Sequence, residues 1–191
     1  MCKIVGIDAD SYISAEIENY EIFHSFEGAV AIGAPLDYLP DIDVIVQRKP
    51  DDIFRVSLWT FISKKLAGIF RDLGACDDCV QIFKANVKKK NGKEFGEYVF
   101  LHVIKKVNCL DTSKTVGQMR KDFHSRVTKL EIIEGRVASS DFIFRIDKLA
   151  MYIFVLNSET VKKLEMSSSR GLRYFTFGEF NNSIYVNRQA I

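Results

Sequence analysis

The stretch IFRVSLWTFISKKLAGIFRDLG, residues 53–74, contains a strand signal followed directly by a helix signal. Its first part, 53–62, is dense in β-branched and aromatic side chains, which is typical of a buried strand. Apolar residues then recur at the spacing of a helix face, at Leu66, Ile69, Phe70 and Leu73. Ser63 can cap this helix by accepting a backbone N–H, and Gly74 can end it in a left-handed conformation. We therefore predict a strand over 53–62 and a helix over 64–73.

The same order of elements recurs near the end of the sequence. MYIFVLN, which starts at residue 151, is typical of a strand, and Asn157 or Ser158 can cap a short helix, SETVKKLEM. Gly171 then precedes a second apolar stretch, LRYFTF, which we also predict as a strand. A duplication would produce this recurrence, and so would the same local physics acting twice. Strand–helix–strand units are thus predicted at 53–87 and 151–177.

Shorter signals fill the rest of the chain. Asn91 and Gly92 lie between two apolar runs and form the dipeptide that a tight type I′ hairpin turn favours. The short apolar runs KIVGI, YEIF, AVAIG and DVIVQ within residues 1–50 predict three or four strands. Further strands are predicted over 129–133 and 142–146. Residues 107–128 are polar and weakly patterned, so loops or a short helix are expected there.

These elements predict an α+β fold, with a mixed or mostly antiparallel sheet and two or three short helices. The 191 residues, of which 47% are hydrophobic and 15 are Phe, can build a substantial core. No low-complexity linker separates the two units, so we expect one domain over 1–191 with a β-rich part over 1–50. The sequence shows no signal-peptide pattern and no apolar stretch long enough for a membrane span. We therefore expect a cytoplasmic protein with reduced cysteines and no membrane partner.

Cys76 and Cys79 form the motif with the strongest resemblance to a chemical site, GACDDCVQIF. A structural zinc site needs a second pair of ligands, and the sequence offers one CxxC and three scattered histidines. A redox pair would open a helix, whereas here the predicted helix ends before the motif. We therefore interpret the motif as a turn. No nucleophile elbow and no phosphate-binding glycine loop is present, so neither a catalytic residue nor a cofactor is predicted.

A nucleic-acid-binding α+β module is the alternative function. The net charge of +2 lacks the basic excess of most such proteins. Lysines 88–90 and Lys93 crowd the predicted hairpin tip, where they could contact phosphate or keep a turn soluble. RGLRYFTF, residues 170–177, agrees in part with an RNA-recognition strand, but Leu172 and Arg173 depart from that pattern. Nucleic acid is therefore the less favoured partner.

Several stretches resemble the immunity protein 11 family of bacterial polymorphic toxin systems. They are FISKKLAGIFRDLGA with the following CVQIFKANV, then GEYVFLHVIKKVNCLDTSKT, IFRIDK and IFVLNSETVKKLEMSSSRGLRYFTFGE. The resemblance covers about 53–180 and rests on the order and spacing of these stretches. Residues 116–128, with Arg120, Lys121 and Arg126, depart from the family pattern. If this segment is an insertion, it is a place where partner choice can differ.

The resemblance implies an antitoxin that binds and neutralises a cognate toxin by direct protein–protein contact, and that is not an enzyme. Such a protein needs exposed side chains on rigidly held loops as contact residues. We predict Asp37, Tyr38 and Asp41, in the PLDYLPD loop, as partner-binding residues. The alternative for these three residues is a plain surface turn.

Overall fold

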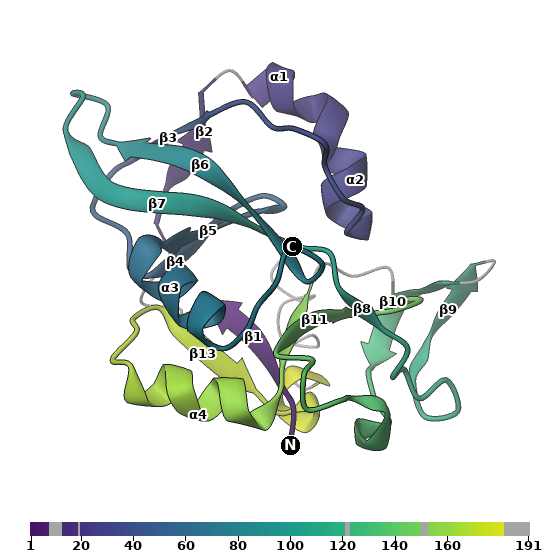
Figure 1. Cartoon of the computed structure of the whole chain (residues 1–191). Coiled ribbons are helices and arrows are strands. Elements are labelled where there is room, and N and C mark those ends of the chain that lie inside the picture. Colours follow the sequence, from purple (N-terminus) through teal and green to yellow (C-terminus); the bar gives the residue numbers. More distant parts are fainter. Residues whose placement is uncertain (8–12, 19, 121–122, 150–152, 182–191) are drawn as a thin grey trace.

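The computed structural model describes residues 1–7, 13–18, 20–120, 123–149 and 153–181. Two sheets dominate it, with helices packed between them and around them (Figure 1). The six-stranded sheet has the order β2 (Ala15–Ile17), β3 (Ile42–Val46), β6 (Val80–Lys88), β7 (Glu94–Val103), β5 (Trp59–Ser63), β4 (Ile53–Val56). Its pairs are antiparallel except for β3 with β6.

The second sheet has five strands and is antiparallel except for the pair of β8 with β11. Its order is β13 (Leu172–Phe175), β1 (Lys3–Ile7), β12 (Phe154–Leu156), β11 (Ile143–Ile146), β8 (Lys106–Val107). A separate hairpin is formed by β9 (Val116–Arg120) and β10 (Phe123–Lys129). The α-helices are α1 (Tyr20–Phe23), α2 (Glu27–Ile32), α3 (Lys64–Asp72) and α4 (Ser158–Met166), and the 3-10 turns are His24–Phe26 and Glu134–Arg136.

The α+β class with mixed sheets is therefore confirmed, although the described residues hold four short α-helices rather than two or three. Both predicted helices are present with their predicted caps. The Ser63 hydroxyl accepts the Leu66 N–H at 3.2 Å, and Asn157 accepts the Thr160 N–H at 2.9 Å. Gly74 follows α3 in the left-handed conformation, with φ +87°.

The two strand–helix–strand units share one topology. In each unit the two strands run parallel, and a third strand lies between them, antiparallel to both. That middle strand is β7 in the unit β5–α3–β6 and β1 in the unit β12–α4–β13. The helices α3 and α4 contact each other between the two sheets. The recurrence found in the sequence thus extends to the arrangement of the strands.

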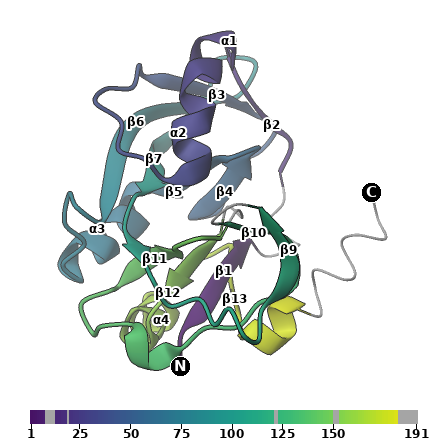
Figure 2. The ribbon, with the colours of Figure 1, turned by 90° about the vertical axis from the view of Figure 1, so that its right-hand side faces the viewer.

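A shared core joins the two units. Ile62 and Leu101 from the six-stranded sheet, Leu66 from α3, Leu164 from α4 and Phe154 from the five-stranded sheet all belong to one buried cluster. Alternate strand residues face the outer cores, because successive side chains in a strand point to opposite faces. The outer face of the six-stranded sheet is covered by α1 and α2, and hairpin β9–β10 stands beside the other sheet (Figure 2).

Two predicted strands in the N-terminal part are wrong, because YEIF forms α1 and AVAIG lies largely in α2. Apolar runs this short do not distinguish a helix face from a strand. KIVGI and DVIVQ are confirmed as β1 and, in large part, β3. The predicted single strand over 53–62 is a hairpin of β4 and β5, in which Ser57 turns the chain with φ +53°.

The hairpin around Asn91 and Gly92 is confirmed, but its turn is not type I′. Gly92 has φ +81°, Asn91 keeps a negative φ, and the Lys89 carbonyl accepts the Gly92 N–H at 2.8 Å. This is the three-residue loop that ends in a left-handed glycine. The largest correction concerns 107–128, where hairpin β9–β10 replaces the expected loops. The strand predicted over 129–133 is also wrong, since β10 ends at Lys129 and only an isolated bridge, Leu110 with Ile132, forms beyond it.

Candidate functional site

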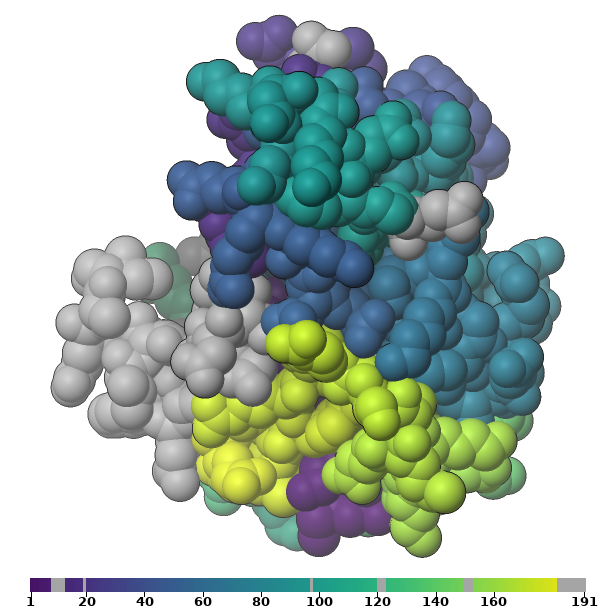
Figure 3. Space-filling view, turned by 90° about the vertical axis from the view of Figure 1, so that its left-hand side faces the viewer, coloured from purple at the N-terminus to yellow at the C-terminus, as the bar shows by residue number. Residues whose placement is uncertain are grey.

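A hollow of about 900 Å³ lies on the surface where the two units meet. Figure 3 faces this side, where residues around 48–65 lie directly against the segment near 170. The walls come from the loop before β4, the start of α3, the first half of β7 and the segment before β13. The hollow is thus built from both strand–helix–strand units.

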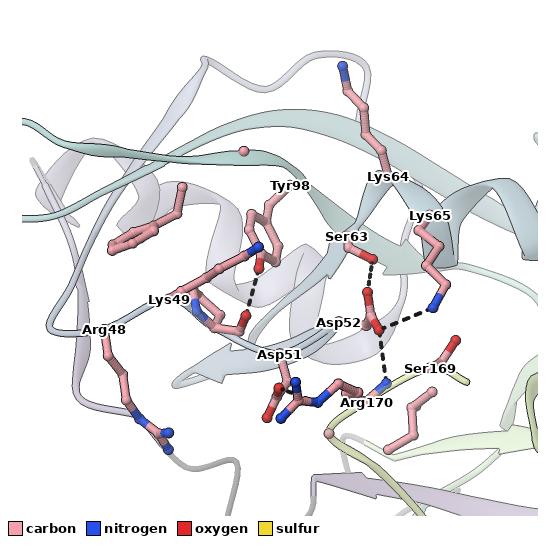
Figure 4. Close-up of a pocket in the computed structure, with 15 residues that line it drawn as sticks. Arg48, Lys49, Asp51, Asp52, Ser63, Lys64, Lys65, Tyr98, Ser169 and Arg170 are labelled. Atoms are coloured by element: carbon pink, nitrogen blue, oxygen red, sulfur yellow. Dashed lines mark hydrogen bonds and ion pairs between the residues drawn. The ribbon is translucent and has the colours of Figure 1, made fainter. Parts of the chain in front are cut away.

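Asp52 is the centre of the polar contacts in this hollow (Figure 4). Its Oδ1 accepts the Ser63 hydroxyl at 2.6 Å, and its Oδ2 accepts the Arg170 backbone N–H at 2.9 Å. The Asp52 N–H in turn donates to the Arg170 carbonyl at 3.1 Å, and Lys65 Nζ lies 3.8 Å from Oδ2. Since Ser63 is the cap of α3, this carboxylate connects the start of that helix to the segment before β13.

The other acidic and phenolic groups of the hollow are also engaged. Asp51 Oδ1 lies 3.4 Å from Arg170 Nε. The Tyr98 hydroxyl donates to the Pro50 carbonyl at 2.8 Å, and burial, with the negative charges of Asp52 and Asp51, raises the pKa of Tyr98 to about 12. A phenol held neutral in this way is a poor base. The polar groups therefore serve to hold two segments together.

The charge of the hollow is predominantly positive. Its lining contains five basic side chains and two carboxylates, namely Arg48, Lys49, Lys64, Lys65 and Arg170 with Asp51 and Asp52. No histidine or cysteine occurs among these described lining residues. Such a surface can attract an acidic group of a partner.

Cys76 and Cys79 lie in the turn between α3 and β6. Their Sγ atoms are 3.2 Å apart, and the Cys79 N–H donates to the Cys76 carbonyl at 2.8 Å. Burial and then the neighbouring Cys76 raise the pKa of the Cys79 thiol, so this thiol resists ionisation. Within the described part of the chain, no three His, Cys, Asp or Glu side chains gather in a way that could hold a metal ion.

The predicted partner-binding residues lie together in the loop between α2 and β3. Tyr38 is 66% exposed and packs edge-to-face on Phe26, with ring centroids 5.6 Å apart. Asp37 is exposed, whereas Asp41 forms an ion pair with Lys84. The Gln81 side chain fixes the loop by accepting from the Leu36 N–H at 2.8 Å and donating to the Leu36 carbonyl at 3.0 Å.

Several of the residues that nucleic-acid binding would use make internal contacts. The Tyr174 ring packs against the shared core, and burial and then the charge of Glu165 raise its pKa to about 12. The Arg173 guanidinium lies 4.7 Å from the centroid of the Phe175 ring. At the hairpin tip, Lys88 pairs with Glu18 at 2.8 Å. These contacts do not favour the alternative function.

His102 is also a core residue. Its side chain is fully buried, and its Nε2 forms a 2.7 Å hydrogen bond with the Ala34 carbonyl. Burial lowers the pKa of His102, so the ring is neutral at pH 7.

The hairpin β9–β10 is an exposed surface that was not predicted as strands, although residues 116–128 departed from the family pattern in the sequence. Val116, Met119 and Phe123 are apolar residues of an otherwise polar segment and are 55%, 58% and 49% exposed. A bulge conceals the strand pattern. Arg126 has φ +48°, and the register between β9 and β10 shifts around it. As a result the buried residues His124 and Val127 are three positions apart instead of two.

The described residues thus define an α+β protein of two strand–helix–strand units, with a polar hollow where the units meet. The chain belongs to the Immunity protein family (Imm11), whose sequence model matches residues 38–179. This match confirms the resemblance found in the sequence. None of the curated proteins matches the chain. Among the described helices, none is both long enough and apolar enough to span a lipid bilayer.

Proposed function

We propose that this protein is the antitoxin of a bacterial polymorphic toxin system and neutralises its cognate toxin by direct, stoichiometric binding in the cytoplasm. The observation that carries the proposal is membership of the immunity protein family over residues 38–179. The internal engagement of the titratable groups in the hollow is consistent with binding in place of catalysis. Neutralisation would follow if the protein covers the active site of the toxin or holds the toxin in an inactive shape.

A rigid surface suits this mechanism, because binding then costs little conformational entropy. The loop with Tyr38 is fixed by Gln81, and the two sheets share one core with α3 and α4. A specific complex of this kind buries about 1,200–2,000 Å² of total surface. That area exceeds any single loop, so several exposed segments would contribute to it.

Within the loop, Tyr38 is the strongest candidate for a contact residue. Aromatic anchors carry a large share of binding energy in protein interfaces, and the exposed Tyr38 ring is held in place by Phe26. Asp37 can add a polar contact at the rim. Asp41 would first have to give up its ion pair with Lys84, so we expect a smaller contribution from it.

Co-expression tests the proposal. The C-terminal domain of the protein that the neighbouring gene encodes is expressed in a bacterial host with and without this protein. We expect restored growth and a one-to-one complex on size-exclusion chromatography. Continued growth arrest, with no complex between the purified proteins, would show that the proposal is wrong.

A further inference from the structure

Strand β9 lies at an open edge of the protein. It pairs with β10, and the described residues place no strand on its other side. Val116, Gly117, Gln118 and Met119 are all exposed. Unpaired edge strands are templates for the addition of another strand, so proteins protect them with charges, bulges or covering segments. In this hairpin the bulge lies in β10, and the centre of β9 carries no charged residue.

The outward backbone groups of β9 can be assigned from one hydrogen bond. The His124 N–H donates to the Lys148 carbonyl at 2.8 Å, which means that it points away from β9. His124 pairs with Met119, so this is a pair without mutual hydrogen bonds. The N–H and C=O of Met119 therefore also point away from β10. By the two-residue alternation of a strand, those of Gly117 do the same.

The hairpin is held firmly against the body of the protein. Val127 and Leu130 are buried in the outer core of the five-stranded sheet. The Asn181 side chain accepts the Leu130 N–H at 2.7 Å and donates to the Leu130 carbonyl at 3.1 Å. Gly117 allows β9 to approach β10 closely, because a Cβ there would lie 2.9 Å from the Ser125 carbonyl oxygen. The open edge is thus pre-organised for pairing.

The charge of this segment identifies the kind of partner. Residues 111–131 contain five basic residues and three acidic residues, a net charge of +2, which equals the total of the whole chain. Two of the basic residues form ion pairs within the segment, Lys114 with Asp111 at 3.6 Å and Lys129 with Glu131 at 3.8 Å. The basic residues are Lys114, Arg120, Lys121, Arg126 and Lys129. Two such edges would repel each other, so self-association through β9 is disfavoured. An acidic segment would be attracted, and Val116 and Met119 could pack against apolar residues within it.

We propose that the free edge of β9 receives an extended, acidic segment of the toxin as an additional strand. The inference rests on the proposed function and names the surface and the class of segment that it binds. Main-chain hydrogen bonds to Gly117 and Met119 would supply affinity, and the basic residues would select acidic segments. A five-residue pairing along β9 spans about 17 Å.

Two measurements with the purified toxic domain of the neighbouring gene test this inference. The first is hydrogen exchange of the unaltered chain, in which the Gly117 and Met119 amides should become protected in the complex. The second is the affinity of Met119→Pro, which removes an outward N–H that β10 does not use and is therefore compatible with an edge strand. We expect binding to weaken at least about tenfold. The matched control Met119→Ala keeps the N–H and should stay within about threefold of the unaltered chain.

The outcomes separate this inference from the proposed function. If the toxic domain binds with no protection of β9 and with full affinity for Met119→Pro, the inference is wrong and the proposed function stands. If the unaltered chain fails both to bind the toxic domain and to restore growth, both are wrong. Binding of poly(U) RNA, or of vesicles of phosphatidylserine and phosphatidylcholine, as tight as that of the toxic domain would also contradict the acidic protein segment as occupant.

Discussion

Arg145 in β11 donates a hydrogen bond of 2.8 Å to the carbonyl of Val30 in α2, 115 residues away in the sequence. Its guanidinium also donates to the Ala31 carbonyl, and its side chain is buried. The last carbonyls of a helix have no partner within the helix and lie at its negative end. The Arg145 guanidinium of the five-stranded sheet therefore donates hydrogen bonds to the C-terminal end of α2, a helix that covers the six-stranded sheet.

Replacing Arg145 with methionine should destabilise the protein. Among the described residues, the Val30 carbonyl would keep only the Gly33 N–H at 3.2 Å, and the Ala31 carbonyl would lose the Arg145 donor. Hydrogen bonds to charged groups contribute about 1.5–3 kcal/mol each. We expect the free energy of unfolding to fall by about 2–3 kcal/mol, measured by urea denaturation. Arg71→Met, at an exposed position of α3, is the control and should change it by less than about 0.5 kcal/mol. Equal effects of the two substitutions would contradict this role of Arg145.

Asp52 and Asp51 should differ in their importance although they are neighbours. Asp52→Asn replaces one acceptor oxygen by a donor that faces either the Ser63 hydroxyl or the Arg170 N–H. We expect a loss of about 1–3 kcal/mol in the free energy of unfolding. Asp51→Asn weakens an ion pair with the exposed Arg170 side chain and should cost about 0–1 kcal/mol. A larger loss for the Asp51 variant would reverse our assignment of Asp52 as the connecting residue.

The stability of the protein should fall in mild acid because of His102. Its pKa in the folded protein is below the ordinary value of 6.5, so the unfolded chain binds more protons in that range. The stability that the neutral His102 ring contributes is fully present above pH 6.5 and is lost as the pH decreases below this value. His102→Gln should flatten the dependence of the unfolding free energy on pH between 7.5 and 5. The control Thr60→Val, also buried but not titratable, should change stability without changing this slope.

Tyr38 should matter for binding and not for folding. On the proposed function, Tyr38→Ala removes an exposed aromatic anchor and should weaken toxin binding by about tenfold or more, measured by isothermal titration calorimetry. Met166 in α4 is even more exposed, at 85%, and Met166→Ala serves as the control. If both variants bind as tightly as the unaltered protein, the loop of residues 37–41 is a plain surface turn.

The expectation of one domain can be tested by unfolding. Trp59, the single tryptophan, lies in the core on the outer face of the six-stranded sheet, and α4 packs on the shared core. Because that core joins both sheets, we expect urea to unfold them in one transition. Trp fluorescence and far-UV circular dichroism should then give the same midpoint. Two separated midpoints would indicate two domains.

Local signals predicted the caps, both helices of the repeated units and most of the strands, because each depends on residues close together in the sequence. Ser63 before an apolar helix face and Gly74 after it determine where α3 lies. The α1–α2 segment was misassigned because its burial depends on contacts with a distant sheet, such as that of Phe23 with Trp59. Propensity in so short a run is easily overridden by tertiary packing.

The candidate surfaces were less predictable than the fold. Tyr38 could be proposed from its loop, but its support by Phe26 and Gln81 is visible only in three dimensions. The hollow around Asp52 joins residues that are more than 100 positions apart. The open edge of β9 was not predicted because residues 116–119 are all exposed and show no alternation, and the bulge at Arg126 breaks the alternation of its partner β10.

The position of β1 has a consequence for synthesis on the ribosome. In the order of synthesis β1 precedes the six-stranded sheet, whereas both of its neighbours, β12 and β13, follow that sheet. The nascent chain can therefore form its six-stranded sheet before β1 has any neighbouring strand. At that stage the apolar residues of α3 are not yet covered by β12 and α4. Domains usually fold as units while synthesis proceeds from the N-terminus. Here the five-stranded sheet has to close around β1 after the six-stranded sheet has been synthesised, because β12 and β13 follow that sheet in the sequence.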